Sequence, residues 1–164
     1  MRYLVRERLF SISDDFWVTD ERGDKIFLVD GKALRLRETF ELKDASGAIL
    51  ATIRKRFLSF TDTLDIEHDG EVVATVHRAI FSLLHHRAYI DIPGRGRLEA
   101  VGNIIDKDFE IRDGGQVVAW ISRKWFTIRD AYGVDVAPGQ NDAFIIAIAV
   151  CLDRIHHDEE ARRG

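Results

Sequence analysis

A run of ten consecutive apolar residues near the C-terminus constrains the fold of this chain more than any other feature. It covers residues 143–152, Ala-Phe-Ile-Ile-Ala-Ile-Ala-Val-Cys-Leu, and follows a long stretch with the character of short strands and turns. A helix that is apolar on every side must be enclosed on every side. The run is far shorter than the roughly 20 residues that a membrane-spanning helix needs. We therefore expect the protein's own sheet, rather than lipid, to surround this helix.

The stretch before the apolar run contains a repeated unit, in which an acidic turn with glycine leads into an alternating strand, basic residues and a return strand. Three copies are clear, at residues 44–56, 69–78 and 113–124, and a looser copy lies at 20–29. Acidic residues and glycine supply the turn chemistry of β-hairpins, and regularly spaced hairpins are typical of a barrel or a sandwich. The sequence predicts a mainly β fold, a closed antiparallel β-barrel of about twelve strands around a central hydrophobic helix at about residues 142–156.

Alternation within the three clear copies predicts which side chains face the helix. One face of each strand carries a large apolar residue, then alanine, then another large apolar residue. The three triplets are Ile49, Ala51 and Ile53; Val72, Ala74 and Val76; and Val117, Ala119 and Ile121. A small residue at each centre leaves room for a bulky neighbour, and the helix is the obvious one. We therefore expect this face of each strand to point inward.

Length and composition narrow the class of protein. A chain of 164 residues with 46% hydrophobic and 32% charged residues is typical of one globular domain, here residues 1–164. The net charge of −4 argues against a dedicated nucleic-acid binder. Cys151, the single cysteine, lies inside the apolar run, so no disulfide framework exists and a reducing compartment is expected. The first ten residues alternate charged and apolar side chains, as in a strand rather than a secretory signal.

Several segments resemble the LURP-one-related family, and its bacterial members in particular. They are residues 9–16, 18–20 and 29–32, the Asp-Gly and Arg-Lys repeats, and Asp142-Ala-Phe at the start of the apolar helix. The resemblance implies a tubby-like fold, in which a barrel closes around a hydrophobic C-terminal helix, and a distant similarity to phospholipid scramblases. Tubby proteins bind phosphoinositide headgroups through a basic surface, but no motif of this chain matches that site. Members of the family mostly have no assigned biochemical activity, so the resemblance informs the fold more than the function.

Basic clusters are the strongest functional lead. Arg54-Lys55-Arg56 and Arg123-Lys124 occupy equivalent points of two duplicated halves, at the end of a strand where the chain turns. Such groups suit a phosphate or an anionic headgroup, because arginine adds paired hydrogen bonds to its charge. The alternative is that they solvate the ends of the barrel and pair with nearby acids. A further basic cluster comprises Lys32, Arg35 and Arg37.

Other patterns favour structural roles. The glycine-rich segment Pro93–Arg97 lacks the spacing of a phosphate loop and is interpreted as a hairpin turn. The pairs His85-His86 and His156-His157 are not chelating by themselves, since adjacent residues of a strand or helix diverge. No metal site or cofactor is predicted. Catalytic residues are not predicted either, because the cysteine is expected to be buried and no nucleophile motif is present.

These observations lead to one functional hypothesis and two alternatives. The hypothesis is a non-enzymatic intracellular binding or regulatory module, cytoplasmic or peripheral to the inner membrane surface and without a transmembrane segment. It recognises anionic phospholipid headgroups through Arg54, Lys55, Arg56, Arg123 and Lys124. A protein-interaction scaffold would instead show an exposed apolar patch without convergent basic groups. An enzyme would show a deep pocket where two carboxylates, or a histidine and a carboxylate, meet. No nucleic-acid partner and no particular oligomeric state are indicated.

Overall fold

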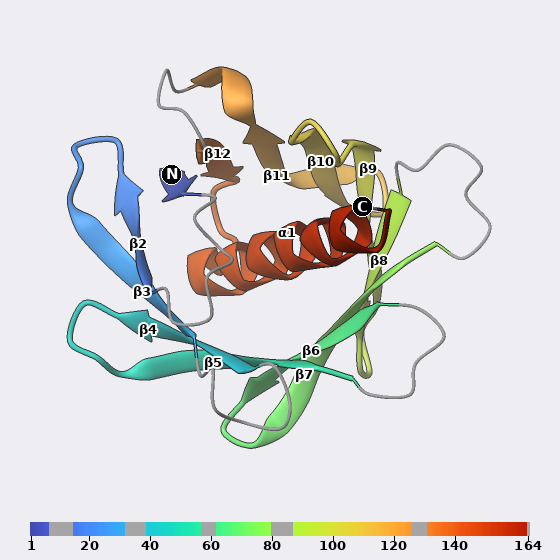
Figure 1. Ribbon diagram of the computed structural model, residues 1–164, viewed down its shortest axis with the longest axis horizontal. Helices are drawn as coiled ribbons and strands as arrows, with labels where there is room; N and C mark the ends of the chain where they lie inside the picture. The colour runs from blue at the N-terminus through green and yellow to red at the C-terminus, as the bar shows by residue number, and fades with distance from the viewer. Residues whose placement is uncertain (7–14, 32–38, 57–61, 80–86, 126–130, 164) are drawn as a thin grey trace.

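Twelve strands form one closed barrel in the structure, a computed structural model that describes residues 1–6, 15–31, 39–56, 62–79, 87–125 and 131–163. The elements are β1 (Arg2–Arg6), β2 (Phe16–Asp20), β3 (Lys25–Gly31), β4 (Thr39–Asp44), β5 (Ile49–Lys55), β6 (Thr63–His68), β7 (Glu71–Arg78), β8 (Arg87–Ile92), β9 (Gly96–Asn103), β10 (Asp108–Asp113), β11 (Gln116–Ser122), the 3-10 turn η1 (Arg123–Trp125), β12 (Ala131–Val136) and the helix α1 (Asp142–Arg163). Each strand pairs antiparallel with its neighbours in sequence, and β1 pairs with β12 to close the ring (Figure 1). The predicted barrel around a C-terminal helix is confirmed.

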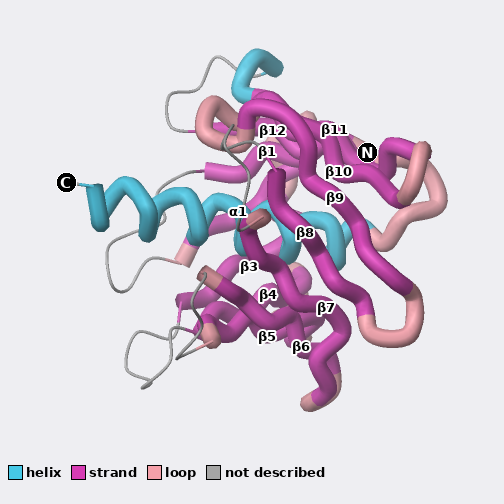
Figure 2. Tube along the Cα trace, turned by 90° about the vertical axis from the view of Figure 1, so that its right-hand side faces the viewer, coloured by secondary structure: helices cyan, strands magenta, loops and turns pink. Residues whose placement is uncertain are grey.

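The helix α1 occupies the interior of the barrel. Asn141 caps it, because the Asn141 Oδ1 accepts a hydrogen bond from the Phe144 N–H at 3.0 Å. Every side chain from Ile145 to Asp153 is buried, so the apolar run is enclosed on all sides as the sequence predicts. The helix ends at Arg163, two turns beyond the predicted boundary. Figure 2 shows its C-terminal part extending past the strands.

The two ends of the barrel differ. At one, which we call the turn end, α1 begins and tight turns join the strands, at residues 21–24, 45–48, 69–70, 93–95 and 114–115. At the other, which we call the exit end, α1 leaves the barrel beside the strand termini Lys55 and Asp108. Within the Pro93–Arg97 segment, residues 93–95 form the β8–β9 turn and Gly96 and Arg97 begin β9, which confirms the interpretation as a hairpin turn.

The helix is tethered to the wall near both ends. At the turn end, the Tyr3 hydroxyl on β1 donates a hydrogen bond to the Asp142 carboxylate. Burial, and then this carboxylate, raise the pKa of Tyr3, so the phenol stays protonated and remains a donor. Towards the exit end, the Lys107 ammonium lies 2.7 Å from Asp153 Oδ1. The two polar contacts fix how far the apolar run can slide along the barrel.

A β-bulge near the start of the outgoing strand interrupts four of the five tight hairpins. The residues without a partner in the register are Ile26, Leu50, Val73 and Val118. An extra residue breaks the alternation of faces between the turn and the rest of the strand. The residue between the turn and the bulge can therefore face the solvent, even where simple alternation would direct it into the core.

The bulges make part of the predicted inward face wrong. Ile49 and Val72 are 54% and 38% exposed, and Val117 is only partly buried. Beyond the bulge the prediction holds, because the three alanines and the large residues that follow them are buried. These are Ala51 and Ile53, Ala74 and Val76, and Ala119 and Ile121.

Enlarging one of these alanines tests whether the barrel is filled. We expect Ala119→Leu to overpack the interior and to lower the free energy of unfolding by about 1–3 kcal/mol. Ala45→Leu, in the exposed β4–β5 turn, is the matched control and should change it by less than about 0.5 kcal/mol. Urea denaturation of both variants gives the comparison. An unchanged midpoint for Ala119→Leu would show that the position does not face a filled core.

The enclosed cysteine gives a second test. Burial raises the pKa of the Cys151 thiol, so very little reactive thiolate forms at neutral or mildly alkaline pH. We expect the native protein not to react with the reagent DTNB at pH 8, and the thiol to become reactive only along the unfolding transition. Rapid reaction of the native protein would contradict enclosure of the helix.

Candidate functional site

The first predicted cluster lies at the exit end of β5 and is paired with acids. Arg54 donates from Nε to Glu67 Oε2 at 2.6 Å. Arg56 forms two hydrogen bonds to Asp65, at 3.0 Å from Nε and 2.9 Å from Nη2. Glu67 and Asp65 both belong to the neighbouring strand β6. These cations therefore hold the outer surface of two adjacent strands together.

Lys55, between the two arginines, has a different role. Its Nζ lies 2.6 Å from Asp158 Oδ2, on the part of α1 that leaves the barrel. Alternate residues of a strand point to opposite faces, so Lys55 reaches the helix while its neighbours face β6. Asp158 also lies 3.3 Å from Arg154 Nη2, one helical turn earlier. Lys55 is thus a link between the barrel wall and the helix.

The second predicted cluster lies in η1, directly after β11. Lys124 donates from Nζ to Asp108 Oδ2 on β10 at 2.7 Å, and this hydrogen bond raises the pKa of Lys124. The raised pKa keeps Lys124 protonated at neutral pH. The backbone N–H of Arg123 donates a hydrogen bond to the Lys107 carbonyl at 3.1 Å.

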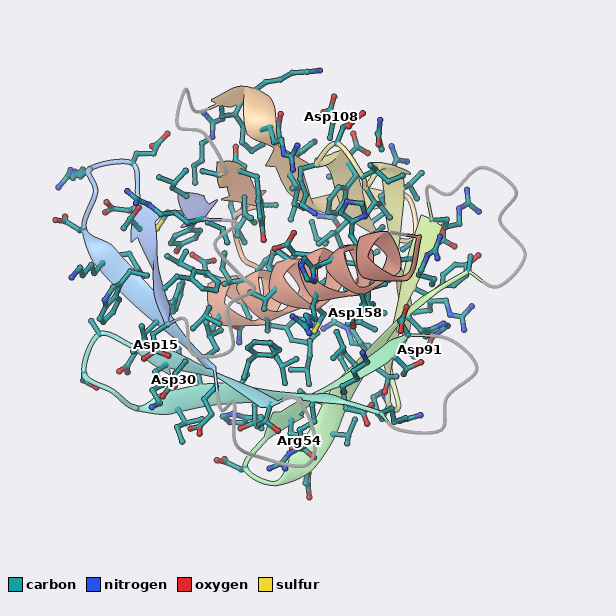
Figure 3. All side chains as sticks on the ribbon, in the orientation of Figure 1. Asp15, Asp30, Arg54, Asp91, Asp108 and Asp158 are labelled. Carbon is teal, nitrogen blue, oxygen red and sulfur yellow. The ribbon has the colours of Figure 1, made fainter. Side chains whose placement is uncertain are left out.

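The structure brings the two clusters to the same end of the barrel but not together. β5 and β11 stand six strands apart in the ring of twelve, counted in either direction. Figure 3 shows Arg54 and Asp108, the partner of Lys124, on opposite walls with α1 between them. One small anion is therefore unable to touch both clusters, and the role of these residues in anion binding stays a prediction.

A buried ion pair at the exit end was not predicted from the sequence. Lys107–Asp153 and Lys124–Asp108 have the same N–O distance, 2.7 Å, but the side chains of the first pair are 3% and 6% exposed and those of the second 78% and 49%. Lys107 also lies 5.8 Å from the ring of Tyr132. One signal was available, since Asp153 is the first charged residue after the apolar run. A carboxylate so close to the apolar run is buried with it, and a buried charge needs a cation as its partner.

The remaining sequence candidates add no second site within the described residues. Lys32, Arg35, Arg37 and the pair His85-His86 lie outside the described residues. His156 and His157 lie on α1. Among the residues that the structure describes, no three His, Cys, Asp or Glu side chains are grouped so as to hold a metal ion.

A histidine and a carboxylate do meet on the outer wall. His77 Nε2 lies 2.7 Å from Asp91 Oδ2, and Arg97 Nε donates to Asp91 Oδ1 at 2.6 Å. Arg97 first, and His77 after it, hold the pKa of Asp91 below its usual value. Asp91 is thus a well-paired carboxylate on a sheet surface, and this arrangement favours a stabilising network across β7, β8 and β9.

An open groove of about 450 Å³ lies at the turn end, between the first turn of α1 and the hairpins of β4 to β9. Its lining is mostly apolar. The lining residues are Leu50, Ala51, Ile66, Val73, Ile92, Ala143 and Phe144, with His68, Arg95 and Asn141 as the polar members. Two of them, Leu50 and Val73, are the extra residues of β-bulges.

A closed antiparallel barrel whose interior is occupied by its own C-terminal helix defines the structural class of this protein. The family model described as LURP-one-related matches residues 1–153, and the chain belongs to that family. Family membership points to an uncharacterised binding or regulatory module.

Similar proteins occur in bacteria and plants. The uncharacterised protein YxjI of Bacillus subtilis is 26% identical over 95% of this chain and 94% of its own length. LURP-one-related 12 of Arabidopsis thaliana is 30% identical over 98% of this chain and 80% of its own length. An X-ray structure of an Arabidopsis thaliana protein shares the fold, with a TM-score of 0.66 and 20% identity over 94% of this chain and 91% of that one. None of these names describes an enzymatic activity. Within the described part of the chain, no helix has the length and hydropathy needed to cross a membrane.

The two lysine–aspartate pairs give a test of which cations are structural. Asp153→Ala leaves Lys107 buried and unpaired, so we expect a loss of about 3–5 kcal/mol in the free energy of unfolding. Asp108→Ala, the matched control, should leave the denaturation midpoint nearly unchanged because its pair is exposed. The double variant Lys107→Met/Asp153→Leu should recover most of the loss. Equal effects of the two alanine variants would contradict the assignment.

Proposed function

We propose that this protein is a non-catalytic binding module of the cytoplasm that docks the exit end of its barrel onto anionic phospholipid headgroups at the inner membrane surface. The observation that supports the proposal is that both predicted basic clusters, although they lie on opposite walls, share that end. The same end carries exposed arginines on two other strands, Arg6 on β1 and Arg87 on β8.

This placement suits a surface better than a single small ligand. Basic residues on β1, β5, β8 and η1 are distributed around the rim of the barrel rather than gathered in one recess. A membrane is flat and wide, so it meets residues on opposite walls at once. Each basic residue near an anionic leaflet adds to the attraction, and no single one needs an enclosed site.

The exposed cations are the ones available to headgroups. Lys124 and Arg56 are paired with acids, but both cations are themselves exposed. The Lys124–Asp108 pair is exposed on both sides, and such pairs contribute little stability, so a phosphate can replace the carboxylate there at small cost. Arg56 presents a planar guanidinium whose two-point contact with Asp65 fits a phosphate equally well. Lys55 and Lys107 are instead committed to the helix. The proposal therefore assigns binding to Arg56 and Lys124, with Arg54 and Arg123 beside them.

The filled interior supports a role without catalysis. The helix takes up the space in which a barrel of this kind would hold a substrate, and Cys151, the only thiol, is enclosed with it. The groove at the turn end is open to solvent, whereas catalytic groups usually act in sites from which water is excluded.

Co-sedimentation with vesicles tests the proposal. We expect the protein to pellet with vesicles of phosphatidylcholine and phosphatidylserine, and not with phosphatidylcholine alone, and the binding to weaken as salt is raised. Arg56→Ala/Lys124→Ala should bind the anionic vesicles about tenfold or more weakly, because two cations near the leaflet are lost.

The control variant also removes two positive charges, but from the turn end of the barrel instead of the exit end. Arg22→Ala/Arg95→Ala, in turns of the turn end, should bind as the unmodified protein does. Negligible binding to both kinds of vesicle at low salt would overturn the proposal. An equal loss in the control would show that total charge, rather than the exit end, governs binding.

A further inference from the structure

Two exposed apolar residues lie next in the chain to residues that line the groove at the turn end. Leu50 and Val73 line the groove, and the residues next to them in the chain, Ile49 and Val72, are two of the four exposed large hydrophobic residues among those the structure describes. All of these lie at the starts of β5 and β7, on either side of β6. The β-bulges put them there, since a regular strand would have turned Ile49 and Val72 into the core.

The groove is open because the barrel wall splays at this point. Pairing between β7 and β8 ends with Thr75 opposite Asp91, so the first four residues of β7 extend beyond the last paired position. Val73, Ile92 and Phe144, which lies in the first turn of α1, line the groove here and are only partly buried. Apolar side chains in such a setting are accessible to an incoming apolar group.

Three carboxylates lie next to the polar residues that line the groove. Asp69 lies in the β6–β7 turn, Glu71 stands opposite His68 in the β6–β7 pair, and Asp113 lies 3.5 Å from Arg95. Arg95 is the one permanently charged cation among the lining residues that the structure describes, and this exposed pair with Asp113 offsets its charge. The nearby carboxylate of Asp142 is directed to Tyr3. An apolar centre with carboxylates around it complements a ligand that is apolar in the middle and basic at its edges.

We propose that this groove is a docking site for a protein segment whose apolar anchor side chains are flanked by lysine or arginine. The anchor fills the space between Val73, Ile92 and Phe144, and the flanking cations meet Asp69 and Glu71, since Asp113 is paired with Arg95. A protein partner also covers Ile49 and Val72, which lie outside the lining of the groove. A fatty acid fits less well, because its carboxylate would stand near those of Asp69 and Glu71 while Arg95 is already paired with Asp113.

The experiment is a selection of random peptides displayed on phage against the purified full chain, followed by fluorescence anisotropy of the enriched peptides. We expect enriched sequences to share one or two large apolar residues flanked by Lys or Arg. Their binding should weaken with salt, because the carboxylates beside the groove contribute through charge.

Two variants locate the binding, each with a matched control. Ile49→Lys/Val72→Lys should weaken the enriched peptides about tenfold or more, because the apolar surface that the partner covers beside the groove is lost and two new cations repel its flanking Lys or Arg. Trp120→Lys, which changes an outer-wall residue as exposed as Val72 (both 38%), should have no effect. Glu71→Lys should weaken them severalfold, whereas Glu21→Lys in the β2–β3 turn should not.

Several outcomes overturn the proposal. They are a selection that enriches no apolar anchor, enriched anchors flanked by acidic residues or without charge preference, and peptides that bind Ile49→Lys/Val72→Lys normally. Displacement of enriched peptides by dodecanoate, but not by dodecyltrimethylammonium, would assign the groove to a small anionic amphiphile instead. None of these results bears on lipid docking, which uses the opposite end of the barrel.

Discussion

Enclosure of one apolar helix is the interaction on which the rest of this structure depends. The side chains from Ile145 to Leu152 have no polar face to give to water, so a wall is needed on every side. A closed ring of strands provides that wall and at the same time leaves no unpaired sheet edge. The alanines at positions 51, 74 and 119 set the room available in the centre. Lys107 follows from the same constraint, because Asp153 continues the buried stretch and its charge has to be matched.

Because the helix fills the interior, the surfaces that remain for binding include the two ends of the barrel. The exit end offers cations around a rim, and the turn end offers an apolar groove with carboxylates nearby. The two surfaces are chemically opposite and the full length of the barrel separates them. A molecule built in this way is suited to hold two different partners at once, one anionic and extended, the other apolar and basic.

The sequence predicts the architecture well because its two periodicities are strong. The apolar run and the repeated hairpins determine the helix, the number of strands and the closure of the barrel. The faces of Ile49 and Val72 were predicted wrongly because a bulge adds one residue where simple alternation assumes none. The adjacent pairs Ile49-Leu50 and Val72-Val73 were the available signal, since two large apolar residues in a row do not fit one alternating strand. The acids that pair with Arg54, Arg56 and Lys124 sit on neighbouring strands, and only the register of the sheet shows which ones they are.

The order of elements along the chain has a consequence for how the protein is made. The helix that fills the barrel leaves the ribosome after all twelve strands, and the strand that closes the ring, β12, comes just before it. Until then β1 has an open edge, and its partner is still to be synthesised: Met1 and Val136, which meet at the seam, are 135 positions apart. The wall therefore exists before its core, as an open and partly apolar sheet. Closure and filling therefore wait until β12 and α1 have been made, which slows folding and leaves the unfinished barrel exposed to aggregation until then.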